Sequence, residues 1–333
     1  MARSDLVKRM MESYQRGDDA GFRSAAADVI AEERKKRHDL LANELETILS
    51  FQSTQKRPLQ VAALKPLPKS RDDLPLLRLE NPRLTLDDLV LKPASRALLL
   101  DVVREFRSGA VLQAHGLRPR SRLLFVGPPG CGKTVTAEAI ASELGFALAR
   151  VNLATVVSSF LGETSRNLES IFSFAETGSW VLVFDEFDAL AKERADASEH
   201  GELKRVVTAF LQLLDGFSGD TMVIAASNHP ALLDSAVWRR FDEVVRFDLP
   251  STEDIARLLH LKLASTRIRF PLEVAASRMT GMTHAEVETV CLDALRHSIV
   301  DGRTEVEWAD YEVGLARMEE RREAVRPVEM HER

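Results

Sequence analysis

The segment from Gly127 to Thr134, GPPGCGKT, constrains this chain most strongly because it fits the pattern G-x-x-x-x-G-K-[ST]. It follows an apolar run with strand character, residues 122–126, and precedes VTAEAIASEL, which has helical spacing and ends at Gly145. A chance glycine-rich turn would not require this strand and this helix on either side. The segment therefore predicts a phosphate-binding loop within an α/β fold.

The residue types explain the chemistry of such a loop. Glycines let backbone N–H groups surround a polyphosphate without side-chain clashes, and the following helix adds partial positive charge. We expect Lys133 to reach the β- and γ-phosphates and Thr134 to bind Mg²⁺. The residues predicted to bind the nucleotide here are Gly127, Pro128, Pro129, Gly130, Cys131, Gly132, Lys133, Thr134 and Val135. A thiol near a helix N-terminus can be reactive, but we favour Cys131 as a small side chain at a variable position.

A second apolar run, residues 179–184, ends in Asp185 and Glu186. Open α/β sheets place their ligands at the carboxyl ends of buried parallel strands. We therefore expect Asp185 to hold Mg²⁺ and Glu186 to polarise the water that attacks the γ-phosphate. Asp188 is expected to have a structural or supporting role.

Composition excludes several other classes of protein. The net charge of −6 argues against a chain that mainly coats nucleic acid, and two cysteines cannot build a disulfide framework. No run approaches the roughly 18 apolar residues of a membrane span, and the charged N-terminus does not resemble a signal peptide. These features favour a cytoplasmic protein without a membrane partner.

The composition also changes along the chain. Residues 1–52 have helical patterns throughout, with Phe22, Ala26, Val29 and Ile30 on one stripe. Residues 53–83 hold five of the 13 prolines and predict an extended linker. We further expect an α/β nucleotide-binding core at 84–250, a helical lid at 251–325, with helices at 252–264, 284–300 and 306–320, and a tail at 326–333.

With these motifs in order, residues 84–316 resemble the AAA+ ATPases, and within them the AAA family proper. The resemblance implies a three-layer αβα P-loop core and a small helical lid. Residues 222–228 resemble a strand ending in sensor 1, so Asn228 would position the lytic water. Arg239 and Arg240, directly before Phe241, resemble the arginine fingers of the meiotic and microtubule-severing branch. They would contact the nucleotide of a neighbouring subunit.

Two further segments match the family. Asp215, Gly216 and Phe217 resemble the inter-subunit signalling motif, which in the family reaches into the adjacent protomer. Residues 280–286 resemble the start of the lid helix that contacts the nucleotide, so Gly281 and Ala285 are expected at the cofactor. Ala285 stands near the place where other AAA+ branches carry an arginine.

Residues 158–163 resemble pore loop 1, and Phe160, Leu161 and Gly162 form its aromatic-hydrophobic-glycine triplet. In a ring, the aromatic side chains would grip an extended protein chain by apolar contact. An alternative is that Phe160 is a core residue of a short helix that Gly162 ends.

The resemblance implies an ATP- and Mg²⁺-dependent ring of the hexameric kind that unfolds, threads or disassembles protein substrates. Residues 1–52 would dock a substrate or an adaptor, by analogy alone. The alternative is a nucleotide-gated scaffold that regulates a partner protein, such as a separately encoded protease, without threading. A nucleic-acid translocase is disfavoured by the acidic total and the absence of a nucleic-acid-binding signature.

Overall fold

The structure is a computed structural model that describes residues 19–35, 66–157, 163–189 and 200–325, together with Lys8 and Ser13. The chain divides into two compact units, Met1–Val61 and Ala62–Arg333. The first unit contains the helix α2, Asp19–Lys35, on which Ala25, Ala26 and Ile30 are buried. The remaining helices predicted for residues 1–52 lie outside the described residues.

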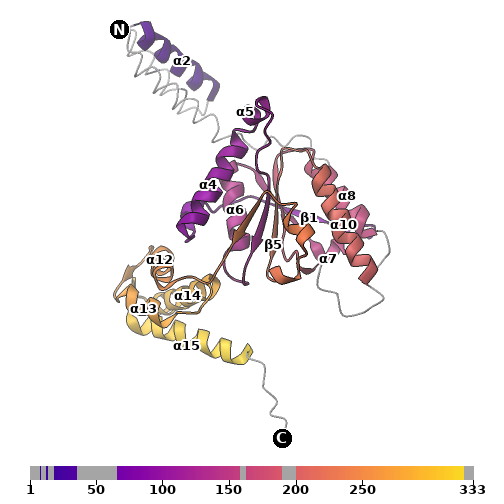
Figure 1. Cartoon of the computed structure of the whole chain (residues 1–333). Helices are drawn as coiled ribbons and strands as arrows, with labels where there is room; N and C mark the ends of the chain where they lie inside the picture. Colours follow the sequence, from indigo (N-terminus) through magenta and orange to yellow (C-terminus); the bar gives the residue numbers. More distant parts are fainter. Residues whose placement is uncertain are drawn as a thin grey trace. The chain divides into compact units, whose positions relative to one another are not determined.

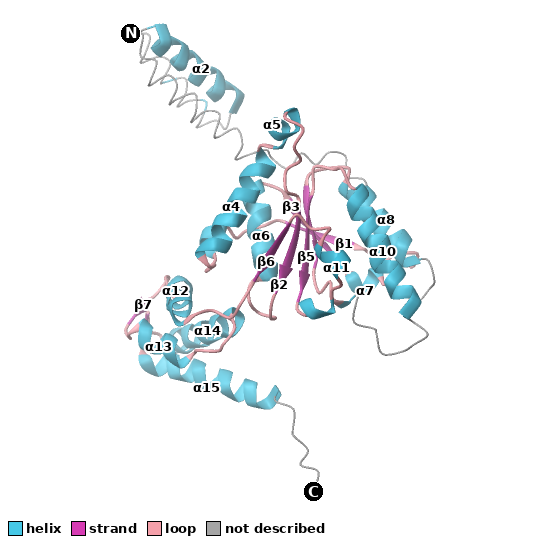
Figure 2. Ribbon diagram, in the orientation of Figure 1, coloured by secondary structure: helices cyan, strands magenta, loops and turns pink. Residues whose placement is uncertain are grey.

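The second unit is built around a six-stranded sheet in the order β1-β3-β4-β5-β2-β6, in which β1 is antiparallel and the other strands are parallel. Its strands are β1 Leu77–Glu80, β2 Arg122–Val126, β3 Ala147–Val151, β4 Trp180–Phe184, β5 Met222–Ser227 and β6 Glu243–Arg246. A mostly parallel sheet with helices on both faces confirms the predicted α/β fold (Figure 2).

The two faces of the sheet are covered by different helices (Figures 1 and 2). One face carries α4 (Pro93–Arg107) and α6 (Lys133–Leu144), and the other carries α8 (Glu163–Ala175) and α10 (His200–Gly216). Alternate residues of β2 supply both interfaces, since Leu123 and Phe125 pack with α4 and α6 while Leu124 packs with α8 and α10. Burial on both faces explains why this strand reads as a continuous apolar run.

Shorter elements connect these layers. They are η1 (Leu86–Asp88), α5 (Gly109–Ala114), α7 (Leu153–Val156), η2 (Pro230–Leu232) and α11 (Ser235–Trp238). No helix in the described ranges is long and apolar enough to cross a membrane.

The segment at 66–83 is not linker, which corrects the boundary expected at Leu84. Its strand β1 pairs with β3, with Leu77 opposite Val151 and Glu80 opposite Leu148. Leu76 is fully buried and Leu77 is only 2% exposed. The prolines misled the prediction because they flank the strand rather than interrupt its hydrogen bonds.

The lid follows the sheet and has its own core. It contains α12 (Thr252–Lys262), α13 (Leu272–Arg278), α14 (His284–Val300) and α15 (Trp308–Val325), with a two-stranded sheet of β7 (Arg267–Ile268) and β8 (Glu305–Val306). Capping boxes start α12 at Ser251 and α14 at Thr283. The short helix α13 was not predicted, and α15 continues beyond its predicted end at 320, to Val325.

Replacing Leu77 with alanine is expected to lower the free energy of unfolding by about 3 kcal/mol, because the change leaves a cavity in the core. Chemical denaturation measures this loss. Leu74→Ala is the matched control, since Leu74 is 53% exposed. Equal losses for the two variants would show that β1 is not a stable part of the sheet.

Candidate nucleotide site

The loop between β2 and α6 has a backbone that only glycine adopts easily. Gly127, Gly130 and Gly132 have φ values of 148°, 73° and 94°. A Cβ atom on Gly127 would lie 2.0 Å from the carbonyl oxygen of Phe247, so no larger residue fits there. The loop therefore has the open, donor-rich backbone that a polyphosphate requires.

Lys133 begins α6 and is only 5% exposed. Its ammonium donates to the carbonyl oxygens of Gly127 and Pro128, each at 2.8 Å. Burial lowers the pKa of this lysine because the charged form loses its hydration. A bound polyphosphate would supply the anionic partner that this desolvated cation lacks.

Thr134 and Asp185 come together although 51 residues separate them in the sequence. The Thr134 hydroxyl donates to Asp185 Oδ2 at 2.7 Å. A hydroxyl and a carboxylate are ligands that suit Mg²⁺, so the two residues fit the predicted metal site.

The sequence interpretation missed Arg150, which lies beside this pair. Its Nη1 is 3.4 Å from Asp185 Oδ2, and Glu80 on β1 holds the same guanidinium with two hydrogen bonds of 3.1 Å. The hydrogen bonds that Arg150 donates to Glu80 are the main reason that the pKa of Arg150 is raised. A charged residue inside the otherwise apolar β3 was the signal that could have revealed it.

Glu186 and Asn228 follow neighbouring strands and reach the same cavity. Glu186 adopts a left-handed backbone (φ 53°), and its N–H donates to Asp185 Oδ1 at 3.0 Å. Asp188, which is 4% exposed, accepts a hydrogen bond from the Asn228 N–H at 3.0 Å. Asp188 thus positions the segment that carries Asn228, in line with the supporting role predicted for it.

The lid closes the cavity from the other side. The N–H of Ala285, at the start of α14, donates to the carbonyl oxygen of Gly130 at 3.0 Å. The resulting cavity has a volume of about 390 Å³, and its lining includes Pro129, Gly130, Cys131, Gly132, Lys133, Thr134, Val135, Asp185, Glu186, Asn228 and Ala285. Gly281 does not line it: its carbonyl oxygen accepts from Arg322 at 2.8 Å instead.

Comparison with known proteins identifies the family. The sequence profile of the "ATPase family associated with various cellular activities (AAA)" matches residues 123–249. An uncharacterized AAA family ATPase of Sinorhizobium fredii is 42% identical over 317 residues, which cover 95% of each chain. The chain belongs to the AAA family of ATPases. It hydrolyses ATP.

More distant relatives include two proteasome-activating nucleotidases. Those of Thermococcus gammatolerans and Pyrococcus abyssi are 30% and 31% identical over 265 and 264 residues. The alignments cover 77% and 75% of this ATPase and 67% and 66% of the relatives.

The two predicted finger arginines of this ATPase have different surroundings. Arg240 is held within its own chain, because its Nε lies 2.6 Å from Asp215 Oδ2. Arg239 is exposed and forms no ion pair with any residue in the described ranges. Neither arginine lines the nucleotide cavity.

The segment expected to signal between subunits lies partly in the core of its own chain. Phe217 is 8% exposed and packs edge-to-face on Phe172, with ring centroids 5.6 Å apart. Gly216 is the last residue of α10. Of the three predicted signalling residues, the structure leaves Asp215 with an exposed, charged side chain, and this side chain contacts Arg240 and Arg122.

The predicted pore residues Phe160, Leu161 and Gly162 lie outside the described residues. Cys131 is 2% exposed, and burial raises the pKa of its thiol, which opposes the reactive-thiol alternative.

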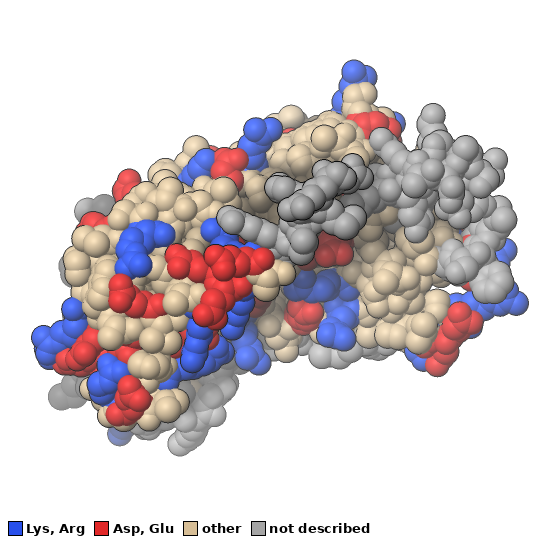
Figure 3. Space-filling view, turned by 90° about the horizontal axis from the view of Figure 1, so that it is seen from below, with Lys and Arg blue, Asp and Glu red and all other residues tan. Residues whose placement is uncertain are grey.

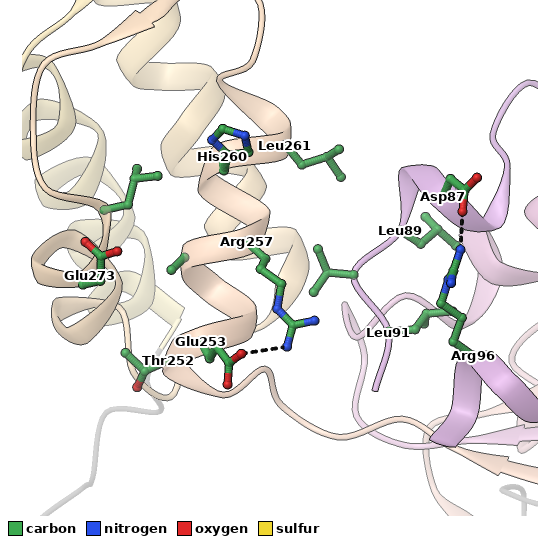
Figure 4. A pocket seen from close by; sticks show the side chains of 13 residues that line it. Asp87, Leu89, Leu91, Arg96, Thr252, Glu253, Arg257, His260, Leu261 and Glu273 are labelled. Atoms are coloured by element: carbon green, nitrogen blue, oxygen red, sulfur yellow. Dashed lines mark hydrogen bonds and ion pairs between the residues drawn. The ribbon is translucent and has the colours of Figure 1, made fainter. Parts of the chain in front are cut away.

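A larger cavity of about 830 Å³ lies between the segment at 87–96 and the helices α12 and α13 (Figure 4). Its charged lining residues include Arg257, paired with Glu253, and Arg96, paired with Asp87. No residue of the phosphate-binding loop lines this larger cavity. The candidate nucleotide site is therefore the cavity of about 390 Å³, although it is the smaller of the two.

Charges on the lid surface are mixed in sign. Figure 3 shows acidic and basic side chains interspersed on the face that it presents. Arg269 pairs with Glu305 and Arg278 pairs with Glu312, which are examples of this arrangement.

Replacing Glu186 with glutamine is expected to slow ATP hydrolysis by about 10²- to 10⁴-fold, because an amide cannot accept the proton of the attacking water. ATP binding should persist, since the phosphate loop is unchanged. Phosphate release and nucleotide binding measure the two effects separately. Glu176→Gln is the control on an exposed position, and unchanged turnover in Glu186→Gln would remove Glu186 from the reaction.

Proposed function

We propose that this AAA ATPase forms a Mg²⁺-dependent ring, of hexameric type, in which each subunit completes the nucleotide site of its neighbour. The ring would use ATP hydrolysis to unfold, thread or disassemble protein substrates. Thr134 and Asp185 would hold the Mg²⁺ ion, and Glu186 and Asn228 would orient the attacking water.

One observation carries the ring proposal. The described lining of the nucleotide cavity includes Lys133 and Lys262 but no arginine, while Arg239 is exposed elsewhere without an ion-pair partner in the described ranges. Phosphoryl transfer gains greatly from an arginine that neutralises developing charge. A second copy of the chain can supply this arginine if subunits pack head to tail, which is the geometry that closes into a ring.

The two arginines are proposed to have different tasks, and their different surroundings support this proposal. Arg239 would reach the nucleotide of the neighbouring subunit, and Arg240 would orient the segment through its ion pair with Asp215. Asp215 also lies 3.8 Å from Arg122 at the start of β2, so the finger segment is tied to the strand that leads to the phosphate loop.

Threading of protein substrates rests on the sequence of residues 158–163 and on the relatives whose name describes activation of a proteasome. The alternative is a nucleotide-gated scaffold that controls a partner protein without threading. The name of these relatives, proteasome-activating nucleotidase, is compatible with this alternative too. The two functions differ in whether Phe160 contacts the substrate.

Mixing two inactive variants tests the shared site. Arg239→Ala and Glu186→Gln are each expected to be nearly inactive, whereas equimolar mixed rings should regain activity at about one quarter of their interfaces. At these interfaces an intact Glu186 in one subunit faces an intact Arg239 from the next. Phosphate release measures the recovery.

The control mixture combines Glu186→Gln with the double variant Glu186→Gln/Arg239→Ala, which has no intact catalytic glutamate and should stay inactive. Arg118→Ala, on an exposed arginine, should retain full activity alone. No recovery in the test mixture would show that Arg239 acts within its own chain, and full activity of Arg239→Ala alone would show that Arg239 has no role in the reaction.

A substrate trap tests threading. Glu186→Gln rings loaded with ATP should retain engaged proteins from a cell extract, and the double variant Glu186→Gln/Phe160→Ala should lose them because the aromatic grip is missing. Mass spectrometry of the retained proteins measures the difference. If both variants retain the same proteins while both bind ATP, the scaffold function replaces threading.

A further inference from the structure

Arg150 lies beside the candidate metal ligand Asp185, although it belongs to none of the motifs that predict the phosphate site. Strands β3 and β4 are parallel, and Arg150 stands opposite Val183 in their register. Val183 belongs to the core on the face of the sheet that α6 covers. Asp185 follows Val183 by two residues, so the register of the two strands brings Arg150 to the Asp185 carboxylate.

Within the described chain, three groups donate to the Asp185 carboxylate. The Thr134 hydroxyl donates to Oδ2 at 2.7 Å, and the Glu186 N–H donates to Oδ1 at 3.0 Å. Arg150 Nη1 is the third donor, 3.4 Å from Oδ2. Thr134 is itself a candidate metal ligand and Glu186 is the next residue of the chain. Arg150 is therefore the donor that can orient Asp185 from a separate strand.

Glu80 fixes the direction in which the Arg150 guanidinium points. Nε and Nη2 of Arg150 each donate to a different oxygen of Glu80 at 3.1 Å, which leaves Nη1 directed to Asp185. The contact with Asp185 is longer than the roughly 2.8 Å of a charged hydrogen bond, so its effect depends on a guanidinium that is held in place. Strand β1, which carries Glu80, thus contributes to the nucleotide site.

Glu80 also offsets the positive charge of Arg150. A lone guanidinium beside a metal ligand would repel Mg²⁺, but the ion pair of Arg150 and Glu80 carries no net charge. The pair can therefore orient the Asp185 carboxylate with little opposition to a metal ion that binds there.

We propose that Arg150, held by Glu80, positions the Asp185 carboxylate to bind Mg²⁺ together with the nucleotide. Hydrogen-bonding partners of a metal's carboxylate ligands fix their orientation and contribute strongly to metal affinity. Arg150 is a positioning residue, because a cation cannot itself ligate Mg²⁺. The inference rests on the proposed assignment of Mg²⁺ to Thr134 and Asp185 and is independent of the ring and of threading.

Binding of a fluorescent, ribose-labelled imido analogue of ATP, which is not hydrolysed, provides the test. Its dissociation constant is measured in EDTA and in excess Mg²⁺, and the ratio of the two constants gives the contribution of Mg²⁺ to binding. By thermodynamic linkage, this ratio falls by the same factor as the affinity of the protein–nucleotide complex for Mg²⁺.

The double variant Arg150→Met/Glu80→Gln removes one positive and one negative charge, so the net charge of the protein is kept. Its ratio should fall about tenfold or more, which is the size expected when a metal ligand loses its hydrogen-bonding partner. Its affinity in EDTA should not change, because the phosphate loop is intact. Arg150→Lys keeps the charge but lacks the planar fork that Glu80 holds, so its ratio should fall between those of the double variant and the wild type.

Two further proteins serve as references. Asp185→Asn should lower the ratio at least as much, and adding Arg150→Met/Glu80→Gln to it should cause no further loss, because the pair acts through Asp185. Arg78→Met is the matched control and should keep the wild-type ratio. Arg78 is exposed, stands opposite Arg150 on β1 and shares a strand face with Glu80.

An unchanged ratio in the double variant would overturn the proposal. Equal losses in Mg²⁺ and in EDTA would also overturn it, since the pair would then only support the fold. If the double variant does not fold, the same criteria apply to Arg150→Lys. A wild-type ratio in Asp185→Asn would refute the Mg²⁺ assignment and the proposal together, whereas a low ratio in Asp185→Asn with an unchanged ratio in the double variant would refute the role of Arg150 alone.

Discussion

The close approach of Gly127 to the carbonyl oxygen of Phe247 is the constraint on which the nucleotide site depends. It allows the phosphate loop to leave β2 between its neighbours β5 and β6, since the Gly127 N–H reaches Ser227 and the Phe247 N–H reaches Val126. A side chain at position 127 would push the loop away from the sheet. The loop would then move away from the acidic residues that follow β4, and the Thr134 hydroxyl would no longer reach Asp185.

The lid covers the same cavity from the other side. The helices α12 to α15 give the lid a core of its own, but its place over the site depends on the start of α14. There the Thr283 capping box fixes the first turn, and the Ala285 N–H holds the turn against Gly130. The phosphate loop and the lid are therefore joined through a few backbone atoms.

Much of the core and the site could be predicted because motif residues sit at the ends of apolar strands. Parallel strands have their carboxyl ends at one edge of the sheet, so Thr134, Asp185 and Asn228 had to converge once the strands were recognised. Strand β1 could not be predicted in this way, because its pairing with β3 is antiparallel and joins segments about seventy residues apart. Arg150 was missed for a related reason: its position beside Asp185 depends on Glu80, which only the folded chain brings near.

Strand β2 also joins the phosphate loop to the segment that carries Arg240. The phosphate loop leaves its carboxyl end, whereas at its amino end the N–H groups of Ser121 and Arg122 donate to Asp242, each at 2.9 Å. The side chain of Arg122 forms an ion pair with Asp215, and Asp215 forms a second ion pair with Arg240. A five-residue strand is about 17 Å long and is stiffened here by hydrogen bonds on both sides. The phosphate loop and Arg240 are therefore joined through one strand, hydrogen-bonded on both sides, and the two ion pairs of Asp215.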